Sequence, residues 1–152
     1  MHKSISKLDM DPIVVKLIDS EEGPGWNKVD ALKAVEEYRK YLHLCKKHTS
    51  STIVPCKKVD TVWHYHILDT LKYDEDCHRI LGKFLHHFPY FGMRGKKDAK
   101  NLNEAWSNTV KLYISEFGSP ESGFWESKTR CPNCGRRCKN GLDLSNETRP
   151  TL

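Results

Sequence analysis

The sequence predicts an all-α fold, a compact bundle of about five helices followed by an irregular tail that carries cysteines. Three observations lead to this prediction. Apolar residues recur at spacings of three, four and seven within segments that end at glycine or proline. No segment shows the alternation of a strand pair, and no internal repeat is present. The length of 152 residues suits one ordinary domain, for which we predict a helical unit over 8–118 and a linker and tail over 119–152.

The first two predicted helices have recognisable starts. Asp11 followed by Pro12 is typical of an N-cap and a first helical position, and predicts a short helix that ends in the loop over residues 21–25. Asn27 is a suitable cap for a longer helix that runs to about His48. One side of this second helix carries lysine and glutamate, and the opposite side carries the predicted core residues Leu32, Val35, Leu42 and Cys45.

Three more helices are predicted after the breaking segment at residues 49–55. The third spans about 57–69, and Thr70 is expected to cap a fourth that ends near Gly82. In the third helix Val62, Trp63 and Ile67 are expected to share the core-facing arc with Leu71 just beyond it. The last helix spans about 98–117 and stops at Gly118; its apolar stripe is predicted to be Leu102, Trp106, Val110, Tyr113 and Phe117.

Charge and hydropathy exclude several classes of protein. The net charge of +5 comes from lysine and arginine mixed with acids, and no nucleic-acid reader motif is present, which argues against nucleic-acid binding. No apolar run approaches the roughly 20 residues that cross a bilayer, and the first residues do not resemble a signal peptide. We therefore expect a cytoplasmic protein with no membrane contact, whose six cysteines are thiols or metal ligands.

Five of the eight histidines lie between residues 57 and 92. At about 100° per residue, His64 and His66 project roughly 160° apart on a helix, so both cannot face one small ion. Asp60 precedes His64 by one turn, and a carboxylate that accepts from one ring nitrogen raises the basicity of the other. The alternative is an acid–histidine pair that only stabilises the helix.

The His86–His87 pair follows the predicted break at Gly82, where the chain can turn back over the preceding helix. We therefore predict a metal site for zinc or iron, built from two or more of four candidate ligands, with Asp60 and Thr70 in support. His64 is preferred over His66, which is expected to bond Thr70 or backbone. The candidate ligands are His64, His66, His86 and His87.

These residues lie in a pattern that resembles a known family. The segments "VDTVWHYHILDT" and "LGKFLHHFPYFG", with a tyrosine and a cysteine between them, are similar to the signature of the glycine-rich-domain-containing-protein-like family. In that family a V-D-x-V-W-H-x-H-x-L-x-T segment precedes a glycine and a histidine-rich turn. The resemblance covers about 59–92 and implies that Asp60 and the four candidate histidines belong to one motif. It implies no reaction.

The tail poses a separate metal question. The sequence "CPNCGRRC" presents Cys131, Cys134 and Cys138 with the C-x₂-C spacing of zinc knuckles, one ligand short of a tetrahedral structural site. A zinc ion here would need a fourth ligand from elsewhere. The alternatives are a redox-active thiol pair, a site completed by another chain, and a tail with no metal.

Three functions remain open at this stage. The first is a small metal-binding protein with an open position for chemistry. The second is a metal-free enzyme in which an Asp60–His64 base works with Cys77 or Tyr73, although no known catalytic motif accompanies it. The third is an interaction module in which the "FPYFGMRG" loop, over residues 88–95, binds a protein or peptide. Substrate, partner and oligomeric state are not fixed by the sequence.

Overall fold

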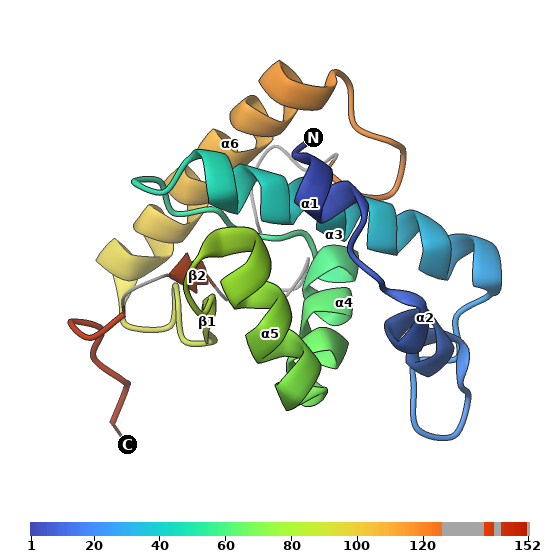
Figure 1. Ribbon diagram of the computed structural model, residues 1–152. Helices are drawn as coiled ribbons and strands as arrows, with labels where there is room; N and C mark the ends of the chain where they lie inside the picture. Colours follow the sequence, from blue (N-terminus) through green and yellow to red (C-terminus); the bar gives the residue numbers. More distant parts are fainter. Residues whose placement is uncertain (126–138, 142–143, 152) are drawn as a thin grey trace.

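The computed structural model describes residues 1–125, 139–141 and 144–151. Its helices pack around α4 and α3, and one small antiparallel strand pair lies at the edge (Figure 1). The predicted all-α class is confirmed, with six helices and two short strands in the described residues. The elements are α1 (Lys3–Ser6), α2 (Asp11–Ile18), α3 (Lys28–Lys47), α4 (Lys57–Leu68), α5 (Thr70–Leu81), β1 (His86–Phe88), α6 (Lys96–Phe117) and β2 (Lys139–Gly141).

The helix ends follow local capping chemistry. The Asn27 side chain accepts a hydrogen bond of 2.9 Å from the Asp30 backbone N–H, as expected for the cap of α3. Two predicted caps are wrong by one residue. Asp69, and not Thr70, caps α5, because its carboxylate reaches the backbone N–H of Lys72. Asp11 is itself the first residue of α2.

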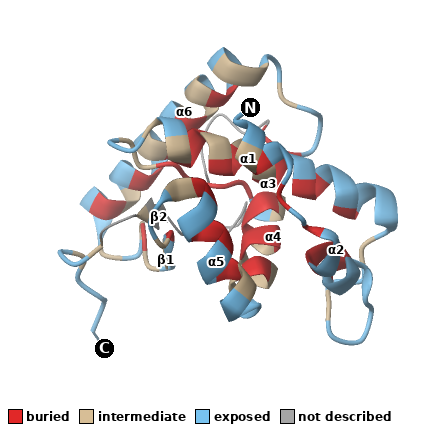
Figure 2. Cartoon of the chain, in the orientation of Figure 1, coloured by how far each residue is buried: buried red, intermediate tan, exposed pale blue. Residues whose placement is uncertain are grey.

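Helix α4 shares the centre of the fold with α3, and it contacts α2, α3 and α5. Most of its surface is buried, whereas the outer faces of α2 and α5 are exposed (Figure 2). Trp63 is fully buried on this helix, as predicted. The predicted core positions Leu32 and Leu71 are wrong, since 44% and 79% of their surfaces are exposed. Helix α4 ends at Leu68 and α5 begins at Thr70. Leu71 therefore does not continue the rotation of α4 that would have turned its side chain inward.

The core extends beyond the predicted limits of 8–118. Ile5 of α1 and Trp125, which follows α6, are fully buried, and Phe124 is largely buried. The Trp125 ring stacks on Trp106 with 5.7 Å between ring centroids. Phe124 and Trp125 therefore add to the helical core, and the boundary between the helical unit and the tail stays a prediction.

The two strands bring a C-terminal segment against the histidine pair. Strand β1 pairs with β2 in antiparallel register, with His87 opposite Asn140. Cys131, Cys134 and Cys138 lie outside the described residues, so the zinc knuckle stays a prediction. Among the residues that the structure describes, none of the helices combines the length and the apolar character needed to cross a membrane.

Gly82 ends α5 with a left-handed backbone, φ 79°, and a Cβ added there would meet no atom within 4 Å. We expect Gly82→Ala to lower the free energy of unfolding by about 1–2 kcal/mol, because only the backbone conformation is penalised. Gly82→Asn is expected to cost less, since asparagine tolerates this conformation. Urea denaturation followed by circular dichroism measures the free energy of unfolding of both variants. Equal losses would contradict a left-handed backbone at residue 82.

Candidate metal centre

Three side chains from two elements converge in the structure. Asp60 and His64 lie one turn apart on α4, and His87 comes from β1. Each of the three offers a ligand atom, and these atoms all lie within 4.8 Å of one another. The left-handed turn at Gly82 reverses the chain after α5, which allows β1 to return to α4. The α4 histidines and the His86–His87 pair were predicted to lie together. One residue of each, His64 and His87, lies in this cluster.

The carboxylate of Asp60 contacts both imidazoles. His87 Nε2 lies 3.3 Å from Asp60 Oδ1, and His64 Nδ1 lies 3.5 Å from Asp60 Oδ2. The two histidine rings are 4.4 Å apart between centroids. Asp60 is fully buried, whereas the side chains of His64 and His87 are 28% and 11% exposed. The Asp60 carboxylate is therefore closed to solvent, and solvent reaches the cluster mainly at His64.

The hydrogen bond of His64 fixes its tautomer. Its Nδ1 lies 2.6 Å from the backbone carbonyl oxygen of Asp60. Because a carbonyl oxygen can only accept, Nδ1 carries the proton, and Nε2 keeps the lone pair that a metal or a proton requires. The sequence predicted that Asp60 orients His64; the structure gives this role to the main-chain oxygen of Asp60 together with its nearby carboxylate.

Buried aromatic residues hold His87 in place. The Trp63 ring packs edge-on against His87, with 4.5 Å between centroids. Trp63 Nε1 donates to Tyr73 Oη at 2.8 Å, and that hydroxyl donates to the carbonyl of Leu85. These bonds tie α4, α5 and the segment before β1 together. The predicted motif contained Trp63 and Tyr73, but their sequence spacing gave no sign that they support His87.

Tyr73 and Cys77 do not suit the catalytic partnership considered for them. Both are buried. Burial raises the pKa of the Tyr73 hydroxyl far above its ordinary value and also raises the pKa of the Cys77 thiol. Both groups are therefore neutral at physiological pH, and Tyr73 serves as a hydrogen-bond bridge in the core.

His66 belongs to a different network on another side of α4. Its Nδ1 lies 3.0 Å from Tyr38 Oη and its Nε2 lies 3.1 Å from Asp76 Oδ2. Burial lowers the pKa of His66 to about 4, although the Asp76 carboxylate acts in the opposite direction. The expected bond to Thr70 or the turn backbone is wrong, because Tyr38 and Asp76 occupy both ring nitrogens. The predicted divergence of His64 and His66 agrees with these contacts.

Asp76 is the negatively charged residue of this buried network. Burial acts to raise the pKa of its carboxyl group, but hydrogen bonds from Lys72 and Arg79 outweigh that effect and lower the pKa below its ordinary value. Lys72 Nζ lies 2.9 Å from Asp76 Oδ2. Asp76 therefore stays ionised while it accepts from a neutral His66, and it joins α5 to α4.

His86 lies outside the cluster as well. It is exposed, and its ring packs against Phe84 with 5.0 Å between centroids. Of the four histidines proposed from sequence, the structure places His64 and His87 beside Asp60 and leaves His66 and His86 in other surroundings.

The "FPYFGMRG" loop does not expose its aromatic rings together. Phe88 and Phe91 are buried and Tyr90 is half-buried. The Arg94 guanidinium lies 4.9 Å from the centroid of the Phe88 ring. Its two phenylalanines belong to the core, which weakens the interaction-module hypothesis.

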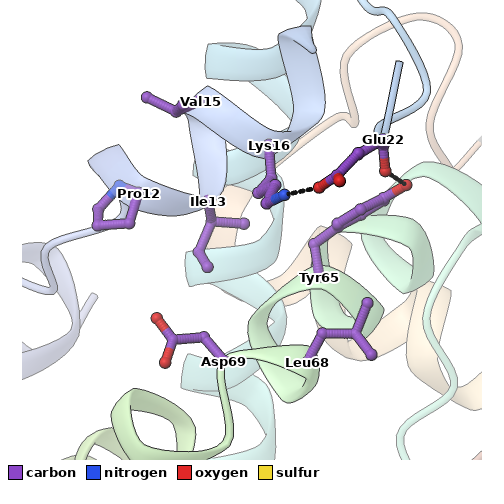
Figure 3. A pocket seen from close by; sticks show the side chains of 8 residues that line it. All are labelled: Pro12, Ile13, Val15, Lys16, Glu22, Tyr65, Leu68 and Asp69. Carbon is purple, nitrogen blue, oxygen red and sulfur yellow. Dashed lines mark hydrogen bonds and ion pairs between the residues drawn. The ribbon is translucent and has the colours of Figure 1, made fainter. Parts of the chain in front are cut away.

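A hollow of about 560 Å³ lies elsewhere, between α2 and the C-terminal end of α4 (Figure 3). Lys16 and Glu22 form an ion pair of 2.5 Å along one side, and Leu68 and Asp69 lie across from it. Its lining contains no histidine and no cysteine. This hollow therefore offers carboxylates but none of the imidazoles of the Asp60 cluster.

The region that contains the cluster is similar to known proteins. The family model described as UCP032817-like matches residues 2–113. The chain is 32% identical over 91 residues to glycine-rich domain-containing protein 1 of Arabidopsis thaliana, and 31% identical over 96 residues to glycine-rich domain-containing protein 2 of the same plant. The alignments cover 57% and 60% of this chain, but only 11% and 12% of the relatives.

The predicted family resemblance is confirmed by these matches. The three cluster residues fall inside the matched region, and the tail cysteines fall outside it. Neither name specifies a metal or a reaction. No solved structure matches the chain significantly.

Proposed function

The chain belongs to the UCP032817-like family, and we propose that its Asp60–His64–His87 cluster binds one divalent metal ion, zinc or iron. The observation that supports this proposal is the approach of three ligand atoms to within 4.8 Å of one another. Two imidazoles and one carboxylate form a donor set that both ions accept in proteins.

One distance within the cluster matches the spacing of two ligand atoms on an ion. Two ligand atoms of a tetrahedral zinc ion, each bonded at about 2.0 Å, lie roughly 3.3 Å apart. His87 Nε2 and Asp60 Oδ1 are separated by 3.3 Å. A bound cation would also offset the cost of burying the Asp60 carboxylate, which is the largest electrostatic cost in such a cluster.

Three protein ligands leave a coordination position open, which is typical of catalytic rather than structural zinc sites. The partial exposure of His64 gives solvent and small molecules a path to that position. A metal ion there would activate a bound water molecule or polarise a ligand oxygen. We therefore propose a metal-dependent reaction on a small molecule as the function of this site.

Metal analysis of untagged protein tests the proposal. Cys131→Ser and Cys134→Ser are introduced first, so that zinc held by the tail does not contribute. After incubation of this double variant with zinc and gel filtration, we expect about one equivalent of bound metal. Zinc sites with three protein ligands hold one ion in this way. His64→Ala and His87→Ala, each in that background, are expected to fall close to zero.

The matched control is His78→Ala. Asp74 and His78 repeat the one-turn acid–histidine pair on α5, with Nδ1 of His78 2.9 Å from the Asp74 carbonyl and 3.4 Å from its carboxylate. Both side chains are more than half exposed, and no third ligand joins them among the described residues. This variant should keep the metal. Metal content that is unchanged in His64→Ala and His87→Ala would refute the proposal, provided that circular dichroism shows folded proteins.

A further inference from the structure

A hollow of about 430 Å³ lies beside the cluster, between residues 86–90 and the C-terminal segment 144–149. Its volume is within the range of small-molecule pockets. His87 lines this hollow and also belongs to the Asp60 cluster. A ligand in the hollow would therefore contact a residue of the proposed metal site.

The C-terminal wall of the hollow is fixed by Arg94. Its guanidinium contacts Glu147 Oε2 at 2.7 Å and the Thr148 carbonyl at 3.1 Å. The same guanidinium pairs with Asp98 at 2.8 Å, which attaches the wall to the first turn of α6. On the N-terminal side of residues 142–143, the pairing of β2 with β1 fixes the chain. The hollow is thus built by long-range contacts.

Two charged side chains line the hollow, Glu147 and Arg149. The Glu147 carboxylate is already paired with Arg94. Arg149 lines the hollow, is exposed, and makes no ion pair with any residue in the described ranges. A guanidinium presents two parallel N–H groups that match a carboxylate. The exposed His86 ring adds a polar group on the facing wall.

Phe88, Pro89 and Leu144 add apolar surface to the lining, beside the polar groups of Tyr90 and Ser145. An apolar body with one anionic end complements such a surface. We propose that the hollow binds a small organic carboxylate through Arg149. This inference rests on the proposed function for its role, because the carboxylate would then be the substrate class of the adjacent metal ion.

Benzoate is a suitable probe, and benzamide is its uncharged counterpart of the same shape. Titration of the full-length protein, followed by two-dimensional NMR, is carried out with zinc added and after treatment with a chelator. We expect benzoate to bind at least about ten-fold more tightly than benzamide, because the charged hydrogen bonds are lost with the amide.

Arg149→Gln is expected to weaken benzoate binding by about ten-fold or more. Lys83→Gln removes an equal charge from an exposed residue that does not line the hollow, and it is expected to leave binding unchanged. Equal affinity for benzoate and benzamide, or for the parent protein and Arg149→Gln, would overturn the inference.

The two proposals fail separately. Benzoate that does not bind to protein carrying one equivalent of zinc would overturn the carboxylate site and leave the metal site intact. Arg149-dependent binding of benzoate to a protein that takes up no zinc would support the carboxylate site and refute its role beside a metal.

Discussion

Trp125→Ala is expected to lower the free energy of unfolding by about 3–5 kcal/mol, the usual cost of removing a buried tryptophan side chain. Trp125 is buried and packs on both Trp106 and Tyr113. Its loss opens a cavity between the segment after α6 and the helices that it covers. Urea denaturation followed by circular dichroism gives the change directly.

Trp125 also donates a hydrogen bond to the buried carboxylate of Glu37. Trp125 Nε1 donates to Glu37 Oε2 at 2.7 Å, while Lys40 Nζ and the Tyr113 hydroxyl bond the other oxygen, Oε1, at 2.7 and 3.1 Å. Without the indole N–H, one oxygen of a buried carboxylate loses its partner, which costs free energy in addition to the cavity.

Trp125→Phe separates the two contributions, because it keeps most of the ring and removes the N–H donor. We expect it to cost about 1–3 kcal/mol, less than Trp125→Ala. A chain that ends after Gly118 should be destabilised at least as much as Trp125→Ala. A loss below about 1 kcal/mol in Trp125→Ala, well under the usual cost, would show that residues 119–125 contribute little to the core.

Acidification from pH 7 to pH 4 is expected to remove about 3 kcal/mol of stability through His66 alone. Burial lowers the pKa of His66 from its ordinary 6.5 to about 4 in the folded protein. Between these two values the unfolded chain binds a proton and the folded protein does not, so unfolding becomes more favourable as the pH falls. Above pH 6.5 both states are neutral at this residue, and below pH 4 both are protonated.

His66→Gln provides the comparison, since glutamine offers both a donor and an acceptor toward Tyr38 and Asp76 but does not titrate. The difference in unfolding free energy between the parent protein and His66→Gln should shift by about 3 kcal/mol between pH 7 and pH 4. Taking this difference removes the contribution of other groups, including His43, whose pKa is also lowered by burial. Parallel pH profiles for the two proteins would contradict a buried, neutral His66.

Local features of the chain determined much of the fold. Asn27 caps α3 and Gly82 stops α5 at the positions expected, because a cap or a left-handed turn depends on residues within one helical turn. The Asp60–His64 pair is local in the same way, since one turn of any helix places residues four apart on one side. The divergence of His64 from His66 follows from the same periodicity.

Contacts between distant residues were decided by the tertiary structure. That His87 rather than His86 reaches Asp60 depends on how β1 lies against Trp63 and pairs with β2. Likewise, His66 finds Tyr38 on α3 and Asp76 on α5, and no periodicity within α4 specifies either partner.

Trp125 shows the same distinction at the end of the helical unit, where a linker-like sequence precedes a residue that completes the core. Helical periodicity fixes only the direction in which a side chain leaves its own helix. Which group meets that side chain depends on the packing of all the helices together, because burying a polar group is favourable only where another element supplies its partner.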